Sequence, residues 1–235
     1  MEVINFVKNE IKSFKKNELI LFFLVILTTC VVSIYSKDSK IALINAICGM
    51  SYTFFSGYGK VYCFLIGLVG TFCYCYLSYK NAFFGNLLLY GCYYFPMQIL
   101  GVFKWKNNLK KDKNEIIKTK LSKKERILYL SFGILFSILC YFVLKFVGDK
   151  NPFMDSFSTI FSIIGMLLTV KRCIEQWYVW FFVNLISFLM WLYAVLNGVN
   201  CIATVVMWGV YLFLSVYFLK MWEKELKLLH LPEKT

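Results

Sequence analysis

Histidine, arginine and proline are scarce in this chain, and each scarcity excludes a kind of site. One of the 235 residues is histidine and three are proline. The histidine, His230, lies in the polar C-terminal tail, so we expect no histidine-based zinc site and no other metal site. The only arginines, Arg126 and Arg172, lie at the edges of long apolar segments. Nothing within those segments is therefore suited to holding a phosphate dianion.

Acidic residues and catalytic motifs are also scarce. All 13 Asp and Glu residues fall in predicted loops, tails or segment edges, so no carboxylate lies where it would relay protons across a membrane. The sequence has no glycine-rich phosphate-binding loop and no nucleophile placed beside a base. The nine cysteines include no Cys-x-x-Cys pair, which favours buried free thiols. We therefore expect neither an enzyme nor a bound cofactor.

Apolar residues, by contrast, make up most of the chain. They account for 60% of it, whereas charged residues account for only 17%. A soluble domain of this size cannot bury so much apolar surface, but lipid accepts it. A helix needs about 20 apolar residues to cross the hydrocarbon core. The sequence predicts an all-α integral membrane protein with eight transmembrane helices, at residues 19–36, 41–57, 60–79, 82–103, 127–147, 154–170, 174–195 and 199–221.

The net charge of +13 is distributed unevenly around these segments. If the N-terminus is cytoplasmic and the eight helices alternate in direction, 21 of the 26 lysines and arginines fall on the inner side. That asymmetry is the positive-inside pattern, so both termini are predicted to be cytoplasmic. The basic excess then faces the anionic headgroups of the lipid bilayer, and we expect no nucleic-acid partner.

The chain also repeats itself at a spacing of 116 residues. Each copy holds three predicted helices, and helix 127–147 lies between the copies. Three helices plus one return the chain to its starting side, so the two triplets must run parallel to each other. The core is therefore predicted to be a 3+1+3 parallel repeat, with helix 19–36 as one extra N-terminal helix. The matching positions are Gly49 with Gly165, Thr53 with Thr169 and, after a one-residue shift, Tyr94 with Tyr211 and Trp105 with Trp222.

These features divide the chain into six parts. Residues 1–17 form either a basic amphipathic helix on the membrane surface or a frayed tail. The lysine-rich connection between the copies is predicted to be largely flexible and to take no part in catalysis. The predicted divisions are 1–40 (amphipathic segment and peripheral helix), 41–103 (first repeat), 104–126 (basic cytoplasmic loop), 127–150 (linker helix), 151–222 (second repeat) and 223–235 (cytoplasmic tail).

Helix 174–195 carries a candidate binding face. Trp177, Trp180, Asn184 and Trp191 recur at helical spacing on one side of it. An amide in the middle of a membrane helix is unfavourable against lipid, so Asn184 should face a cavity or a partner helix. An interfacial tryptophan belt explains Trp177 and Trp191 well. The pairing of Trp180 with Asn184 favours a binding site instead.

Helix 82–103 offers a second face, with Tyr90, Tyr94 and Gln98 one turn apart. Pro96 should kink this helix, a distortion that membrane proteins tolerate where the backbone lines a cavity. Gln98 should lie at about the depth of Trp180. The alternative is that Gln98 only bonds a neighbouring helix.

Helix 154–170 has polar residues toward its outer end. Asp155 either caps the helix or attracts a cationic solute at the outer mouth. Thr159 is a weaker candidate, because small hydroxyl residues on membrane helices mostly serve packing. The aromatic and amide faces together favour a neutral or cationic aromatic substrate that carries hydroxyl or amide groups.

A longer motif runs through the second copy. It reads Pro152-Phe153-x-Asp155-Ser156, and later Lys171-Arg172-x-x-Glu175-Gln176-Trp177-x-x-Trp180-x-x-x-Asn184-x-Ile186-Ser187. Its counterpart in the first copy is Tyr94-x-Pro96-x-Gln98-x-x-Gly101-x-x-x-Trp105. With these residues the chain resembles the PnuC family of bacterial vitamin transporters over about residues 41–222. Many members have Glu-Asn-Trp at Glu175-Gln176-Trp177, a departure that bears on substrate choice.

The resemblance implies a carrier that moves an unphosphorylated vitamin by facilitated diffusion. Nicotinamide riboside comes first as substrate, with thiamine or riboflavin as alternatives, and a cytoplasmic kinase would trap it. The resemblance also implies a SWEET-like core of seven helices, a multi-pass place in the bacterial inner membrane and a homotrimer. A membrane scaffold acting through the basic loop stays the alternative. We expect the substrate-binding residues to be Trp180, Asn184, Gln98, Tyr94, Trp177, Thr159 and Asp155, with Trp177 and Trp105 as inner gates or anchors.

Overall fold

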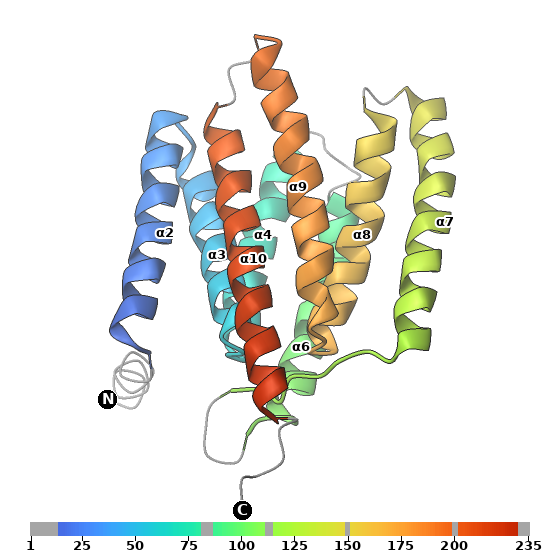
Figure 1. Cartoon of the computed structure of the whole chain (residues 1–235). Coiled ribbons are helices and arrows are strands. Elements are labelled where there is room, and N and C mark those ends of the chain that lie inside the picture. The colour runs from blue at the N-terminus through green and yellow to red at the C-terminus, as the bar shows by residue number, and fades with distance from the viewer. Residues whose placement is uncertain (1–13, 81–86, 111–114, 149–150, 199–201, 230–235) are drawn as a thin grey trace, which may run out of the picture.

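The described part of the chain folds into eight rod-like helices joined by turns and loops (Figure 1). The computed structural model describes residues 14–80, 87–110, 115–148, 151–198 and 202–229. A π-helical turn, η1, runs directly into α6, so those two elements count as one rod. The elements are α2 (Lys16–Tyr35), α3 (Lys40–Gly57), α4 (Cys63–Lys80), η1 (Leu89–Tyr94), α6 (Phe95–Lys106), α7 (Lys123–Val147), α8 (Pro152–Val170), α9 (Glu175–Leu196) and α10 (Ile202–Leu229).

The helices present apolar side chains to their surroundings. Within the described residues, α2, α4, α7, α8, α9 and α10 are each long and apolar enough to cross a membrane. Large apolar side chains point outward along them, and Phe146 on α7 is 92% exposed. A water-soluble protein would not leave so many such groups uncovered. The all-helical, multi-pass membrane architecture predicted from the sequence is confirmed.

Six of the helices close into a ring. Around it the order is α3, α4, η1–α6, α8, α9 and α10, and α10 packs back against α3. We call α3, α4 and η1–α6 the first triplet, and α8, α9 and α10 the second triplet. The third helix of each triplet therefore packs against the first helix of the other. Outside the ring, α7 packs on α8 and α2 packs on α3, at opposite edges of the view in Figure 1.

One end of the bundle gathers most of the basic residues of the described chain. We call it the basic end. α2 begins there, α10 ends there, and the turns between α3 and α4 and between α8 and α9 lie there (Figure 1). Local sequence explains the helix ends. Ser122 caps α7 with Glu125 in a capping box, which starts the helix four residues before the predicted Ile127.

The helix that contains Pro96 departs from regular geometry where the sequence predicts a kink. Pro96 has no N–H to donate to the carbonyl of Cys92, four residues earlier. The preceding turn widens into the π-helix η1, in which the N–H of Phe95 donates to the carbonyl of Tyr90, five residues earlier. The wider turn shifts the register of Tyr90 and Tyr94 relative to Gln98.

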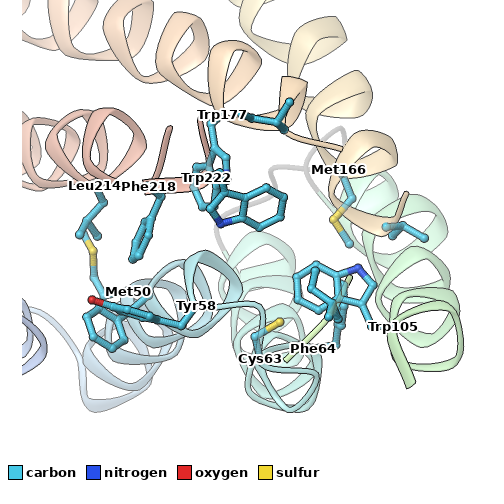
Figure 2. Close-up of a cluster of buried hydrophobic side chains, with 14 of the residues drawn as sticks. Met50, Tyr58, Cys63, Phe64, Trp105, Met166, Trp177, Leu214, Phe218 and Trp222 are labelled. Carbon is cyan, nitrogen blue, oxygen red and sulfur yellow. The ribbon is translucent and has the colours of Figure 1, made fainter. Parts of the chain in front are cut away.

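Fully buried aromatic side chains fill the ring toward the basic end. Figure 2 shows Trp105 beside Phe64, and Trp177 beside Trp222 and Phe218. The ring centroids of Trp177 and Trp222 are 5.8 Å apart at a near-perpendicular angle. Trp105 and Trp222 are completely buried. The interior is therefore closed at this end by packed indole and phenyl rings.

A segment of the basic connection, residues 115–122, crosses the basic end and is bound at both triplets. We call it the strap. The N–H of Ile116 donates to the carbonyl of Gly59, in the first triplet. Farther along, the N–H of Thr119 donates to the carbonyl of Arg172, in the turn before α9. The sequence predicts a flexible loop here, whereas the strap is held in place by backbone hydrogen bonds that its composition does not reveal.

The C-terminal part of α10 holds the strap by charge. Glu225 forms ion pairs with Lys110 and Lys118. The ammonium of Lys118 also lies 4.9 Å from the ring centre of Trp222. Burial lowers the pKa of Lys118 from its ordinary value, although the ion pair with Glu225 opposes that shift. These contacts explain why α10 continues to Leu229, well into the segment 223–235 predicted as a tail.

Candidate functional site

A cavity of about 420 Å³ lies inside the ring, and all six ring helices line it. Its size is within the range of small-molecule sites. From α3 and α4 come, among others, Asn45, Tyr52, Thr53, Thr71 and Tyr74. From η1–α6 and α8 come Tyr90, Tyr94, Gln98, Ser162 and Met166. From α9 and α10 come, among others, Trp177, Trp180, Asn184, Trp208 and Tyr211.

Asn184 and Trp180 lie on the cavity side of α9. The side-chain nitrogen of Asn184 donates to the carbonyl of Tyr211 on α10 at 3.1 Å. An amide can form more bonds than that one, so its oxygen and second N–H stay available to a ligand. The indole nitrogen of Trp180 donates to the hydroxyl of Thr169 on α8 at 3.1 Å. That bond fixes the plane of the Trp180 ring at the cavity wall.

Gln98 is held in the opposite wall. Its side-chain oxygen accepts a hydrogen bond from the hydroxyl of Thr71 on α4 at 3.2 Å. Room for the amide comes from Gly67, because a Cβ at that position would lie 3.1 Å from the side-chain nitrogen of Gln98. The bond to Thr71 uses the oxygen and leaves the two N–H donors of the amide for a ligand.

Three tyrosines form a stack along the same wall. The rings of Tyr90 and Tyr94 are 4.8 Å apart and nearly parallel. Tyr74 on α4 lies on the other side of Tyr90, with 4.1 Å between ring centres. The π-helical turn places Tyr90 and Tyr94 in this register. The stack presents aromatic faces, which attract a flat cationic ring.

Trp177 forms the floor of the cavity toward the basic end. It is 2% exposed and packs against Phe218 at 5.2 Å between ring centres. Its indole nitrogen has no hydrogen-bond partner among the described residues. Trp105 lies deeper, among the closing aromatic residues, where its indole nitrogen donates to the carbonyl of Thr169. Trp177 therefore faces the site, whereas Trp105 anchors the closure beneath it.

The electrostatic character of the cavity is simple. No Lys, Arg, His, Asp or Glu is among the described residues that line it. Its polar groups are hydroxyls and amides, and its largest lining side chains are aromatic. Such a site can stack an aromatic cation and bond hydroxyl or carboxamide groups. It has no cationic partner for a phosphate group.

Comparison with known sequences assigns the chain to a family. The family model described as nicotinamide mononucleotide transporter matches residues 39–224, which include all six ring helices except the last turn of α10. The chain belongs to this family.

Two named relatives and one solved structure agree with that assignment. A protein of Neisseria mucosa named nicotinamide riboside transporter PnuC is 29% identical over 202 residues, or 84% of this chain and 77% of that protein. A protein of Haemophilus influenzae with the same name is 25% identical and covers 92% of this chain and 94% of its own length. The crystal structure titled as the vitamin B3 transporter PnuC matches with a TM-score of 0.76 at 25% identity, and covers 92% of this chain and 94% of that one.

Five of the residues that the sequence predicts to bind substrate line the cavity of this family member. They are Trp180, Asn184, Gln98, Tyr94 and Trp177. The other two, Asp155 and Thr159, are not among the lining residues. By helical spacing they lie on the same face of α8 as Ser162, with Thr159 one turn and Asp155 two turns farther from the basic end. Their part in binding stays a prediction.

Sequence reasoning left out several residues that line the cavity, among them Tyr52, Tyr74 and Thr71. One of the missed residues, Tyr211, carried a usable signal, because it is the repeat partner of Tyr94. Both tyrosines line the cavity. Tyr52, which bonds the sulfur of Met166 at 3.6 Å, has no such counterpart. Tyr52 reaches the cavity only through the packing of the six ring helices.

Proposed function

We propose that this chain carries nicotinamide riboside across the membrane by facilitated diffusion. Family membership supports a transporter, and both named relatives are nicotinamide riboside transporters by name. The observation that carries the proposal is the cavity lined by all six ring helices, with aromatic walls, amide groups and no charged residue among the described lining. Nicotinamide riboside is a flat aromatic cation with a carboxamide and ribose hydroxyls, which are the groups this site can bind.

The absence of a cationic lining residue favours the riboside over the phosphorylated mononucleotide. A phosphate dianion taken from water into this cavity would lose its hydration without an Arg or Lys to replace it. The pyridinium ring, in contrast, can stack against the aromatic faces of Trp180 and of the three stacked tyrosines. We assign Trp180 and Tyr94 to the ring, and Asn184 and Gln98 to the ribose or the carboxamide.

We also propose that the basic end faces the cytoplasm, with both termini on that side. The distribution of lysine and arginine supports this orientation. Trp177, Trp222 and the strap then close the cavity on the cytoplasmic side. Entry from outside and release inside would follow from alternate opening of the two ends, with the two parallel triplets tilting about the cavity between them. Phosphorylation by a kinase in the cytoplasm would then trap the vitamin, and a homotrimer is the proposed assembly.

Counterflow into proteoliposomes tests the function directly. Vesicles loaded with unlabelled nicotinamide riboside should take up the labelled compound, and unloaded vesicles should fill only to the external concentration. Nicotinamide mononucleotide should compete poorly. Accumulation above the external level would contradict facilitated diffusion, and absence of flux would favour a scaffold. Thiamine and riboflavin belong in the same competition series, because either one competing better than the riboside would reassign the substrate.

Two alanine variants test the site. Trp180→Ala and Asn184→Ala should each weaken riboside binding by about tenfold or more, because each removes a group worth roughly 1–2 kcal/mol to a bound ligand. Leu189→Ala, on the outward face of the same helix, is the matched control and should bind normally. If both cavity variants keep the affinity of the unmodified chain, the site is assigned wrongly.

A further inference from the structure

A second recess lies outside the ring, between α7 and the basic-end parts of α8, α9 and α10. We call it the lateral pocket. Its volume is about 700 Å³. It exists because α7 packs on α8, where Gly133 leaves room for Phe161 and Ile164, and makes no close packing with α9 or α10. The strap residues Lys120 and Leu121 form its border at the basic end.

The lateral pocket has two chemically different parts. Its walls carry apolar side chains such as Leu130, Ile164, Leu168 and Leu226. Its rim carries charged groups at the point where α7 and α9 begin and α10 ends. With the proposed orientation, that rim lies at the depth of the inner-leaflet headgroups, and the walls lie at the depth of the acyl chains.

The charged residues at the rim sum to one net positive charge, because Lys120, Arg126 and Lys227 face Glu175 and Glu223. Glu175 is neutralised by Arg126, whose guanidinium nitrogen lies 2.7 Å from its carboxylate oxygen. Glu223 accepts a hydrogen bond from Tyr178 at 2.5 Å. Lys120 and Lys227 have no hydrogen bond or ion pair among the described residues. Two cationic side chains thus flank an apolar recess without an ion pair among the described residues, and the rim as a whole keeps its net positive charge.

We propose that the lateral pocket binds an anionic phospholipid of the inner leaflet. The phosphate of the headgroup lies between Lys120 and Lys227, and one acyl chain occupies the apolar walls below. Each basic residue at an anionic membrane surface strengthens binding, and the paired arrangement adds the geometry of a defined site. Because Lys120 belongs to the strap, an occupied pocket also holds the strap against α10. The proposal depends on the orientation proposed above, but not on the identity of the transported vitamin.

Lipid retention tests the proposal on the full chain. The protein is placed in nanodiscs of phosphatidylcholine with phosphatidylglycerol, extracted into detergent, and its bound lipids are counted by native mass spectrometry. The unmodified chain should retain phosphatidylglycerol in preference to phosphatidylcholine. Lys120→Gln with Lys227→Gln should lower that preference by about tenfold. Leu130→Trp, which fills the recess and keeps the rim charges, should lower it too.

Matched controls decide between a site and a generally basic surface. Lys106→Gln with Lys224→Gln removes the same charge from exposed positions at the basic end outside the lateral pocket, and should retain phosphatidylglycerol normally. Equal loss in this control overturns the proposal, as does unchanged retention in the two pocket variants. If Leu130→Trp changes the mass of the assembled protein but leaves lipid retention unchanged, the lateral pocket is an interface between chains and the lipid proposal is overturned.

A normal thermal shift with nicotinamide riboside shows that each variant is folded. If that shift is missing from the unmodified chain, the transport proposal fails while the lipid count still stands.

Discussion

The indole nitrogen of Trp222 donates a hydrogen bond to the carbonyl oxygen of Gly57 at 2.6 Å. Trp222 lies on the last helix of the second triplet, and Gly57 ends the first helix of the first triplet. The reverse contact also exists, because Trp105 on α6 donates to the carbonyl of Thr169 near the end of α8 at 2.9 Å. The two tryptophans are repeat partners in the sequence. Each triplet is therefore bound to the backbone of the other by an indole, although the acceptors differ by one turn, because Thr169 is the repeat partner of Thr53 and not of Gly57.

Replacing Trp222 tests this cross-connection. Trp222→Phe keeps an aromatic ring but leaves the buried carbonyl of Gly57 without a donor, which costs about 1–3 kcal/mol. For a chain of this size the melting temperature should fall by roughly 2–10 °C, measured by thermal unfolding in detergent. Tyr193→Phe, at an exposed position on α9, is the control and should melt normally. A melting temperature of Trp222→Phe equal to that of the control would show that the bond contributes little.

Gly165 sets the position of the Trp180 ring. A Cβ at Gly165 would lie 3.0 Å from the Trp180 ring, so the ring would have to shift by a few tenths of an ångström to accommodate it. Gly165→Ala should therefore push the ring toward the cavity and weaken riboside binding by about tenfold, measured by isothermal calorimetry. Gly91→Ala serves as the control, because a Cβ there meets nothing within 4 Å. Normal affinity in Gly165→Ala would show that Trp180 yields without affecting the site.

The ion pair between Glu225 and Lys118 should keep the strap in place. Glu225→Gln leaves the buried ammonium of Lys118 without its counter-charge, so the strap should detach more often from α10. Cys173, which is 4% exposed and lies beside Thr119 of the strap, should then react faster with a maleimide. Mass spectrometry of the labelled peptide measures that rate. The control is Glu115→Gln, which removes only the weaker contact with Lys110, so Cys173 should react slowly in it. Equal rates of Cys173 labelling in the two variants would contradict the role of Glu225.

Transport should be insensitive to pH near neutrality. The ionisable side chains among the described cavity residues are tyrosines, which in peptides titrate only near pH 10. Counterflow of nicotinamide riboside should therefore run at the same rate at mildly acidic and mildly alkaline pH, and an imposed proton gradient should not drive accumulation. A rate that changes severalfold across that range would indicate a titrating group that the cavity lining does not contain.

The membrane-spanning helices could be predicted from the sequence because each one is a long apolar segment of consecutive residues. Eight apolar segments predicted the eight rods, and the faces of helices 82–103 and 174–195 predicted Tyr94, Gln98, Trp180 and Asn184 at the cavity. In each case the spacing of a few residues along one helix carries the information. The parallel relation of the two triplets stays a prediction, which the similar indole-to-backbone contacts of Trp105 and Trp222 support.

What the sequence did not predict depends on partners far along the chain. Lys118 and Glu225 are 107 residues apart, and nothing near either residue marks the pair. The acceptors of the two indole bonds are backbone carbonyls, which every residue possesses. The π-helical turn was predicted only as a kink, because Pro96 removes a donor without specifying how the preceding turn adjusts.

Because each indole binds a main-chain oxygen, the docking of one triplet on the other does not depend directly on the side chain at the acceptor position. Any amino acid at position 57 or 169 offers the same acceptor, as long as the helix ends in the same place. Other contacts constrain the side chains at those positions, because a Cβ at Gly57 would clash with the Phe218 ring and the hydroxyl of Thr169 accepts the hydrogen bond from Trp180. The docking itself therefore requires particular side chains only at the two tryptophans, whereas the acceptor positions are constrained by local packing and by the cavity.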